Sequence, residues 1–115
     1  MKNSCLVLEG GGLRGAFTSG VLEYFLERNL NFDRVIGVSA GACIGASFLS
    51  KQQGRNRKVN VENPSPEYSI GRTEKRLDLR LRLYHHGYQL AGEVFEEIKL
   101  FLDGTVAHPL TDHLK

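Results

Sequence analysis

The sequence predicts an α/β fold built on a parallel sheet, and three observations support this prediction. Two short apolar runs, residues 5–8 and 34–38, each lead into a turn that contains glycine. Residues 17–28 place their apolar side chains at helical spacing between these runs, and a second helical segment, residues 40–52, follows. This alternation of strand and helix is typical of parallel strands joined by a crossover helix. We therefore expect two fully buried strands with helices on the faces of the sheet.

The length and composition fit one globular domain. The chain has 115 residues, of which 41% are hydrophobic and 24% are charged, and its formal net charge is +2. This charge is too small to indicate a nucleic-acid-binding protein, and the apolar content argues against disorder. We expect a single domain over residues 1–115, in which residues 1–60 carry the clear strand and helix pattern and residues 61–115 diverge from it.

Positive charge is concentrated in the middle of the chain. Residues 51–84 contain nine basic and four acidic side chains, whereas residues 85–115 contain two basic and five acidic ones. A basic segment of this kind either contacts anionic lipid or forms a solvated surface. The longest weakly polar stretch, residues 38–49, is well short of the ~20 residues that span a bilayer. We therefore expect a cytoplasmic protein with at most a peripheral membrane contact.

The two cysteines, Cys5 and Cys43, both lie in apolar segments. We expect them to be buried and reduced, which is usual for cysteines of a cytoplasmic protein. Neither these cysteines nor the histidines show the spacing of metal ligands, so we predict no metal site and no cofactor.

The second half of the chain has a weaker pattern. Residues 54–66 are polar, contain two prolines and predict a loop. Leucines at positions 77, 79, 81 and 83 alternate with largely polar residues, which predicts a strand with one solvated face. Residues 85–87, His-His-Gly, would form a turn after it. From Leu90 onward, apolar residues recur at helical spacing and predict an amphipathic helix.

The turn after the second predicted strand has the sequence Gly37-Val38-Ser39-Ala40-Gly41, which matches the Gly-x-Ser-x-Gly nucleophile elbow. In that arrangement the serine lies on a tight, strained turn that projects its hydroxyl from the carboxyl edge of the sheet. Gly37 and Gly41 would let strand and helix approach closely, and the N-terminus of the helix would favour negative charge on a reacting oxygen. The alternative is that Ser39 only caps the helix.

The turn after the first predicted strand allows three interpretations. Gly10, Gly12 and Gly15 fit the G-x-G-x-x-G pattern of dinucleotide-binding proteins. That function needs an acidic residue at the end of the second strand, where this chain has Ser39 instead. The glycines would otherwise serve packing alone, or their N–H groups would form an oxyanion hole. Because the carboxyl ends of parallel strands meet at one edge of a sheet, this turn would lie beside Ser39, which favours the oxyanion hole.

These two turns, at this separation, resemble those of the patatin-like phospholipase family over about residues 6–60. The resemblance implies a parallel sheet wrapped by helices. It also implies a serine hydrolase that cleaves lipid or fatty-acyl esters with a Ser–Asp dyad, without histidine, and that needs no cofactor. Ser39 would be the nucleophile. The resemblance places four residues near the oxyanion: Gly10, Gly11, Gly12 and Arg14.

The aspartate of such a dyad is harder to assign. The family's aspartate stands in a later Asp-Gly-Gly or Asp-Gly-Ala segment, and the corresponding segment here is Asp103-Gly104-Thr105. Its third residue departs from the family, and its separation from Ser39 is short. We take Asp103 as the candidate base, against the alternative that Gly104 is the C-cap of the preceding helix.

Other assignments of the second half stay open. Asp33 and Asp112 are weaker candidates for the base. His108 or His113 would complete a Ser–Asp–His order, although four histidines are too few for that order to be informative. The chain would alternatively be a truncated family member without activity, since it is short and departs from the family after residue 60.

Overall fold

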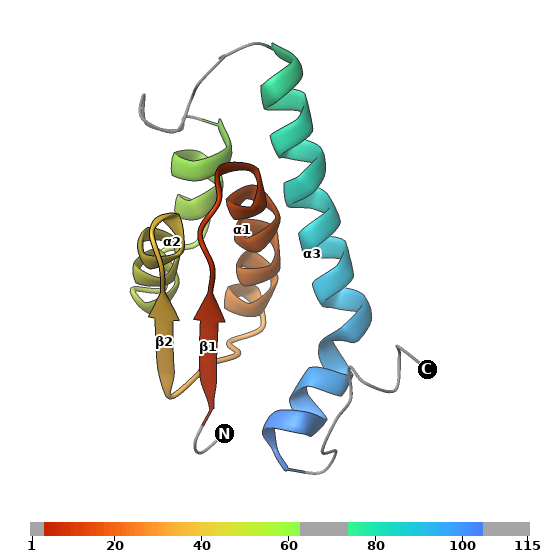
Figure 1. The fold of residues 1–115 in the computed structure, drawn as a ribbon. Helices are drawn as coiled ribbons and strands as arrows, with labels where there is room; N and C mark the ends of the chain where they lie inside the picture. Colours follow the sequence, from red (N-terminus) through yellow and green to blue (C-terminus); the bar gives the residue numbers. More distant parts are fainter. Residues whose placement is uncertain (1–3, 63–73, 105–115) are drawn as a thin grey trace.

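The computed structural model describes residues 4–62 and 74–104 (Figure 1). Within them, two strands, β1 (Cys5–Leu8) and β2 (Arg34–Gly37), pair in parallel. Three α-helices accompany the strands in the same described residues: α1 (Gly12–Glu27), α2 (Ala40–Leu49) and α3 (Glu74–Leu102). A short π-helix, η1 (Arg57–Glu62), lies between α2 and α3 in the chain. The predicted α/β class with a parallel sheet is confirmed.

The core lies between one face of the sheet and the helices. Strand side chains alternate between the two faces of a sheet, and here Leu6, Leu8 and Val35 face the helices. Each of β1, α1, α2 and α3 contributes to one buried apolar cluster. Its members are Leu8, Leu22, Phe25, Leu26, Leu30, Ile44, Phe48, Ala91 and Phe95.

The opposite face of the sheet is exposed. Val7 and Ile36 are partners in the β1–β2 register and are 67% and 53% exposed, and Val38 is 61% exposed. The expectation of two fully buried strands is therefore wrong, because an apolar run does not reveal whether one or both of its faces are covered. Cys5 is also exposed, as is Cys43 on α2, so the predicted burial of the two thiols is wrong too.

Helix α3 runs without interruption through the segment predicted as a strand, a turn and a helix. The predictions of a strand over residues 77–83 and of a turn over residues 85–87 are wrong. Leucine and arginine, which alternate there, are both strong helix formers, so their period of two does not exclude a helix. Tertiary packing decides the outcome. A Cβ atom added to Gly20 of α1 would lie 1.9 Å from the Tyr84 carbonyl oxygen, and one added to Gly87 of α3 would lie 2.1 Å from the Phe17 carbonyl oxygen.

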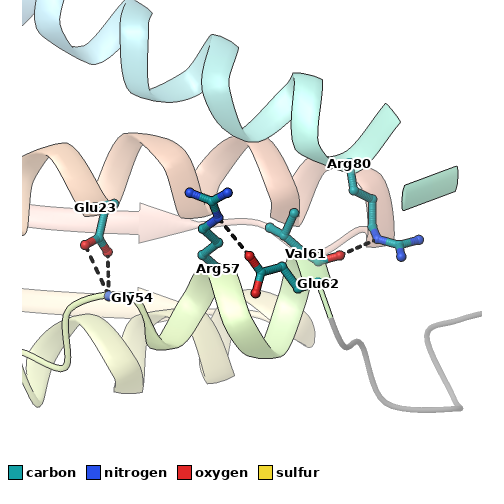
Figure 2. A network of polar contacts seen from close by, with 6 residues as sticks. All are labelled: Glu23, Gly54, Arg57, Val61, Glu62 and Arg80. Atoms are coloured by element: carbon teal, nitrogen blue, oxygen red, sulfur yellow. Dashed lines mark hydrogen bonds and ion pairs between the residues drawn. The ribbon is translucent and has the colours of Figure 1, made fainter. Parts of the chain in front are cut away.

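The predicted loop over residues 54–66 contains η1, and two side chains from other elements bond to η1 and to the turn that precedes it (Figure 2). Glu23 is buried on α1, and both of its carboxylate oxygens accept hydrogen bonds from the Gly54 N–H, at 3.0 and 3.1 Å. Arg80 of α3 donates a hydrogen bond from Nε to the Val61 carbonyl oxygen at 2.8 Å. These contacts fix a polar segment between two helices, which the local sequence does not indicate.

Candidate active site

The turn between β2 and α2 carries Ser39 in an unusual backbone conformation. Ser39 has φ 56° and ψ −124°, and non-glycine residues rarely adopt a positive φ. Two hydrogen bonds hold the turn: the Val38 N–H donates to the Leu8 carbonyl oxygen of β1 at 3.0 Å, and the Gly41 N–H donates to the Val38 carbonyl oxygen at 2.9 Å. A strained serine between a strand and a helix has the backbone geometry of a nucleophile elbow.

The Ser39 hydroxyl is available for chemistry. The residue is exposed, and its side chain makes no capping hydrogen bond to α2. Ser39 is thus the N-cap residue of α2 by position, but its side chain does not cap the helix. Helix α2 begins at the next residue, so its N-terminal N–H groups and dipole lie beside the hydroxyl and favour negative charge there.

Gly37 and Gly41 allow the strand and the helix to meet at this turn. A Cβ atom added to Gly37 would lie 2.5 Å from the Gly41 carbonyl oxygen. A Cβ atom added to Gly41 would lie 2.5 Å from the Leu8 carbonyl oxygen. Both contacts are with backbone atoms, which cannot move aside as a side chain can. The predicted close approach of strand and helix at these two glycines is confirmed.

The three residues Gly10, Gly11 and Gly12, which we call the glycine loop, follow β1, and Gly10 lies beside Ser39. A Cβ atom added to Gly10 would lie 3.0 Å from Ser39 Cβ and 3.6 Å from its Oγ. Gly11 has φ 126°, and α1 begins at Gly12, earlier than the predicted start at residue 17. The first N–H groups of a helix have no partner within that helix. The structure thus brings these backbone donors and the serine to the same edge of the sheet.

Arg14 folds back over the glycine loop. Its Nε lies 2.9 Å from the position that a Cβ atom on Gly11 would occupy. Its Nη1 donates a hydrogen bond to Glu9 Oε1 at 3.0 Å, and both side chains are 72% exposed. Glu9 belongs to none of the motifs that the sequence contains. The only indication in the sequence is that Glu9 and Arg14, which have opposite charges, flank a glycine turn. Their separation of five residues is not a spacing typical of a helix or a strand.

Asp103 lies elsewhere. It follows the last residue of α3, its N–H donates to the Lys99 carbonyl oxygen at 2.9 Å, and it is exposed. Gly104 has φ 79° and donates its N–H to the Phe101 carbonyl oxygen, so it ends the helix as a C-cap. Figure 1 shows α3 ending near the edge where the strands begin, whereas Ser39 follows the opposite end of β2. The structure does not bring Asp103 to Ser39, and the dyad stays a prediction.

The weaker catalytic candidates have structural roles or lie outside the described residues. Asp33 accepts a hydrogen bond from the Ser4 N–H at 3.3 Å and donates its own N–H to the Ser4 hydroxyl at 2.9 Å, which joins the amino ends of the two strands. The histidines of the predicted turn, His85 and His86, are exposed on α3. Three further candidates lie outside the described residues: His108, Asp112 and His113.

Several basic side chains of residues 51–84 make contacts within the chain. Arg57 pairs with Glu62 at 3.1 Å (Figure 2), and its guanidinium lies 5.2 Å from the centre of the Tyr84 ring. Arg55 donates from Nε to the Ser47 hydroxyl at 3.2 Å. These contacts favour a structural role for part of the basic segment. No helix within the described residues is long and apolar enough to cross a membrane.

The titration shifts lie at the α1–α3 interface. Burial raises the pKa of Tyr84 to about 12, and the Glu23 carboxylate adds to the shift. A hydrogen bond to Glu27 raises the pKa of Tyr88. Among the residues that the structure describes, no three His, Cys, Asp or Glu side chains gather as a metal site would require.

Comparisons with known proteins identify the family of the chain. A search of the solved structures found no match. The chain is 51% identical over 55 residues to the uncharacterized protein YjjU of Escherichia coli strain K12. This match covers 47% of the chain but only 15% of that relative, so the chain spans a small part of its length. The patatin-like phospholipase family matches residues 6–113, which is most of the sequence. The chain therefore belongs to the patatin-like phospholipase family.

Proposed function

We propose that this chain is a serine acyl hydrolase that acts on lipid or fatty-acyl esters, with Ser39 as its nucleophile. The observation that carries the proposal is the Ser39 turn itself. Ser39 stands on a strained turn, and its exposed hydroxyl makes no capping hydrogen bond to α2. Gly10 of the glycine loop lies against Ser39. Membership of the family supports ester hydrolysis as the reaction class.

The chemistry follows from this arrangement. The Ser39 Oγ attacks the carbonyl carbon of the ester while its proton passes to a base, and the carbonyl oxygen becomes negatively charged. N–H groups of the glycine loop and of Ala40 at the start of α2 are the donors for this oxygen, with Arg14 as a nearby positive charge. Collapse of the intermediate expels the alcohol and leaves an acyl group on Ser39. Water then releases the acid.

The base is a separate part of the proposal. Asp103 is the aspartate that the resemblance implies, and it follows α3 near the opposite edge of the sheet from Ser39. A Ser39–Asp103 dyad therefore requires the end of α3 to lie elsewhere when the enzyme reacts. The nucleophile and the base are consequently tested by separate measurements.

The nucleophile is tested with a fluorophosphonate probe and a short-chain chromogenic ester. We expect the probe to label the wild-type chain and Ser39→Ala to lose both labelling and hydrolysis. Ser50→Ala is the matched control, because Ser50 is an exposed serine at the other end of the same helix. Equal labelling of the wild-type chain and Ser39→Ala would contradict the proposal.

The base is tested with Asp103→Asn. If Asp103 takes the serine proton, this variant slows ester hydrolysis by roughly 100-fold or more, the usual contribution of a general base. A rate within twofold of the wild type would remove Asp103 from the mechanism and leave the Ser39 assignment intact.

An inactive family member is the second candidate. Two observations favour it: α3 carries Asp103 away from Ser39, and the outer face of the sheet leaves Val7 and Ile36 exposed. In that case the folded wild-type chain would resist the probe, although its circular dichroism shows the expected helix content.

A further inference from the structure

The ion pair between Glu9 and Arg14 occupies a special place among those of the described residues. Three others join residues of a single helix or neighbours at its end: Arg28 with Glu27, Arg57 with Glu62, and Arg82 with Asp78. Glu9 and Arg14 instead stand on either side of the glycine loop. Their side chains meet at 3.0 Å and so close a ring around the loop.

Arg14 contacts Gly11, the residue that follows the glycine lying against Ser39. Arg14 Nε packs against Gly11, at 2.9 Å from the position of a Cβ atom, and a side chain there would displace the guanidinium. On the other side, Glu9 precedes Gly10, whose backbone lies against Ser39. A change in the Glu9–Arg14 pair therefore acts on the loop from both ends.

This pair contributes little to folding. Both side chains are 72% exposed, and exposed ion pairs add little to the stability of a protein. What the pair does determine is the place of the Arg14 guanidinium, since a long side chain with no anchor would sample many rotamers. Loss of Glu9 should therefore affect the geometry of the loop far more than the stability of the fold.

We propose that Glu9 is a positioning residue, which holds Arg14 across the glycine loop and so keeps the loop N–H groups directed at the oxyanion of the Ser39 reaction. This inference rests on the proposed function. It adds a residue whose carboxylate acts through Arg14 and does not itself touch the substrate.

The first test is the rate at which a fluorophosphonate labels Ser39 in the full chain. Glu9→Gln should slow labelling by roughly tenfold to a hundredfold, the range for small displacements of a catalytic group. Arg14→Gln should slow it at least as much. The double variant should be no slower than Arg14→Gln alone, because Glu9 has no effect once its partner is gone.

The control is Arg82→Gln, which breaks an exposed ion pair on α3. It should label within twofold of the wild type. Thermal unfolding of all four variants should stay close to that of the wild type, which separates positioning from stability.

A second readout does not require activity. Backbone hydrogen exchange at the glycine loop should be faster in Glu9→Gln than in the wild type, and unchanged in Arg82→Gln. Wild-type labelling and exchange in Glu9→Gln, or effects of the two single variants that multiply, would overturn the inference. A chain whose Ser39 reacts normally in Glu9→Gln would keep the proposed function. A wild-type chain that never reacts would remove that function, and the exchange rates would still decide the role of Glu9.

Discussion

The structure of the strand–helix unit, residues 5–49, and the structure of helix α3 are determined by different kinds of contact. In the first, glycines at fixed positions determine where a strand turns into a helix, because a Cβ atom at Gly41 would meet the backbone of β1. In the second, packing against α1 makes a continuous helix out of a segment with alternating leucines. Local steric constraint thus shapes the candidate active site, whereas tertiary contact shapes its surroundings. If the two regions are independent, a change at one should leave the other intact.

The largest effect is expected for Gly41→Ala. Its Cβ atom would lie 2.5 Å from the Leu8 carbonyl oxygen, so α2 must move away from β1 and the Ser39 turn must deform. We expect a loss of about 3 kcal/mol in the free energy of unfolding, from urea denaturation, together with loss of Ser39 labelling. Gly45→Ala on the same helix is the control, since its Cβ atom would meet side chains alone, Val35 at 3.0 Å and Leu8 at 3.3 Å. Normal labelling of Gly41→Ala would show that the turn tolerates a side chain there.

Gly87→Ala tests the other region. Its Cβ atom would lie 2.1 Å from the Phe17 carbonyl oxygen and would push α3 away from α1. We expect a similar loss of about 3 kcal/mol in the free energy of unfolding, but with labelling of Ser39 retained below the unfolding transition. Gly92→Ala, which meets the Tyr24 ring at 3.1 Å, should cost less. If Ser39 is not labelled in folded Gly87→Ala, the conformation of the Ser39 turn depends on α3, and the two regions are not independent.

The smallest effect is a pH dependence that arises at the same interface. The pKa of Tyr84 is about 12 in the folded chain and 10.0 in the reference state, so folding favours the protonated phenol. Its contribution to stability is complete below pH 10 and is lost as the pH rises towards 12. The wild type should lose on the order of 1 kcal/mol between pH 9 and pH 11 through this group. Tyr84→Phe should lose that much less over the same range, measured by urea denaturation, and equal losses would show that Tyr84 titrates normally.

The parts of the fold that sequence could predict are those that steric rules define locally. The strand at residues 5–8 is found as predicted, and the second strand ends at Gly37, one residue before its predicted end. Ser39 stands at a positive φ, as an elbow serine requires. In each case the neighbouring residues allow one conformation of a glycine turn or an apolar run. A few adjacent residues are therefore enough to predict the local structure.

The parts that sequence could not predict depend on residues far apart in the chain. Residues 77–83 form a helix because Gly20 on α1 admits α3 at close range, and nothing near residue 80 records that contact. The exposure of the outer face of the sheet could not be predicted for the same reason. Val7 and Val35 both stand in apolar runs, and only tertiary contacts decide which of them is covered. The distance between Ser39 and Asp103 likewise depends on the direction in which α3 runs. The number of residues between them does not reveal that direction.

The strain at Ser39 also bears on how such a chain would change over generations. Glycine adopts a positive φ freely, so Ser39→Gly would relieve a conformation that costs about 1 kcal/mol or more in any other residue. A lineage with no use for the hydroxyl would gain stability from this single exchange. Serine at this position therefore lowers the stability of the fold. Once selection for its chemistry had ceased, we expect replacement of this serine to be among the early changes.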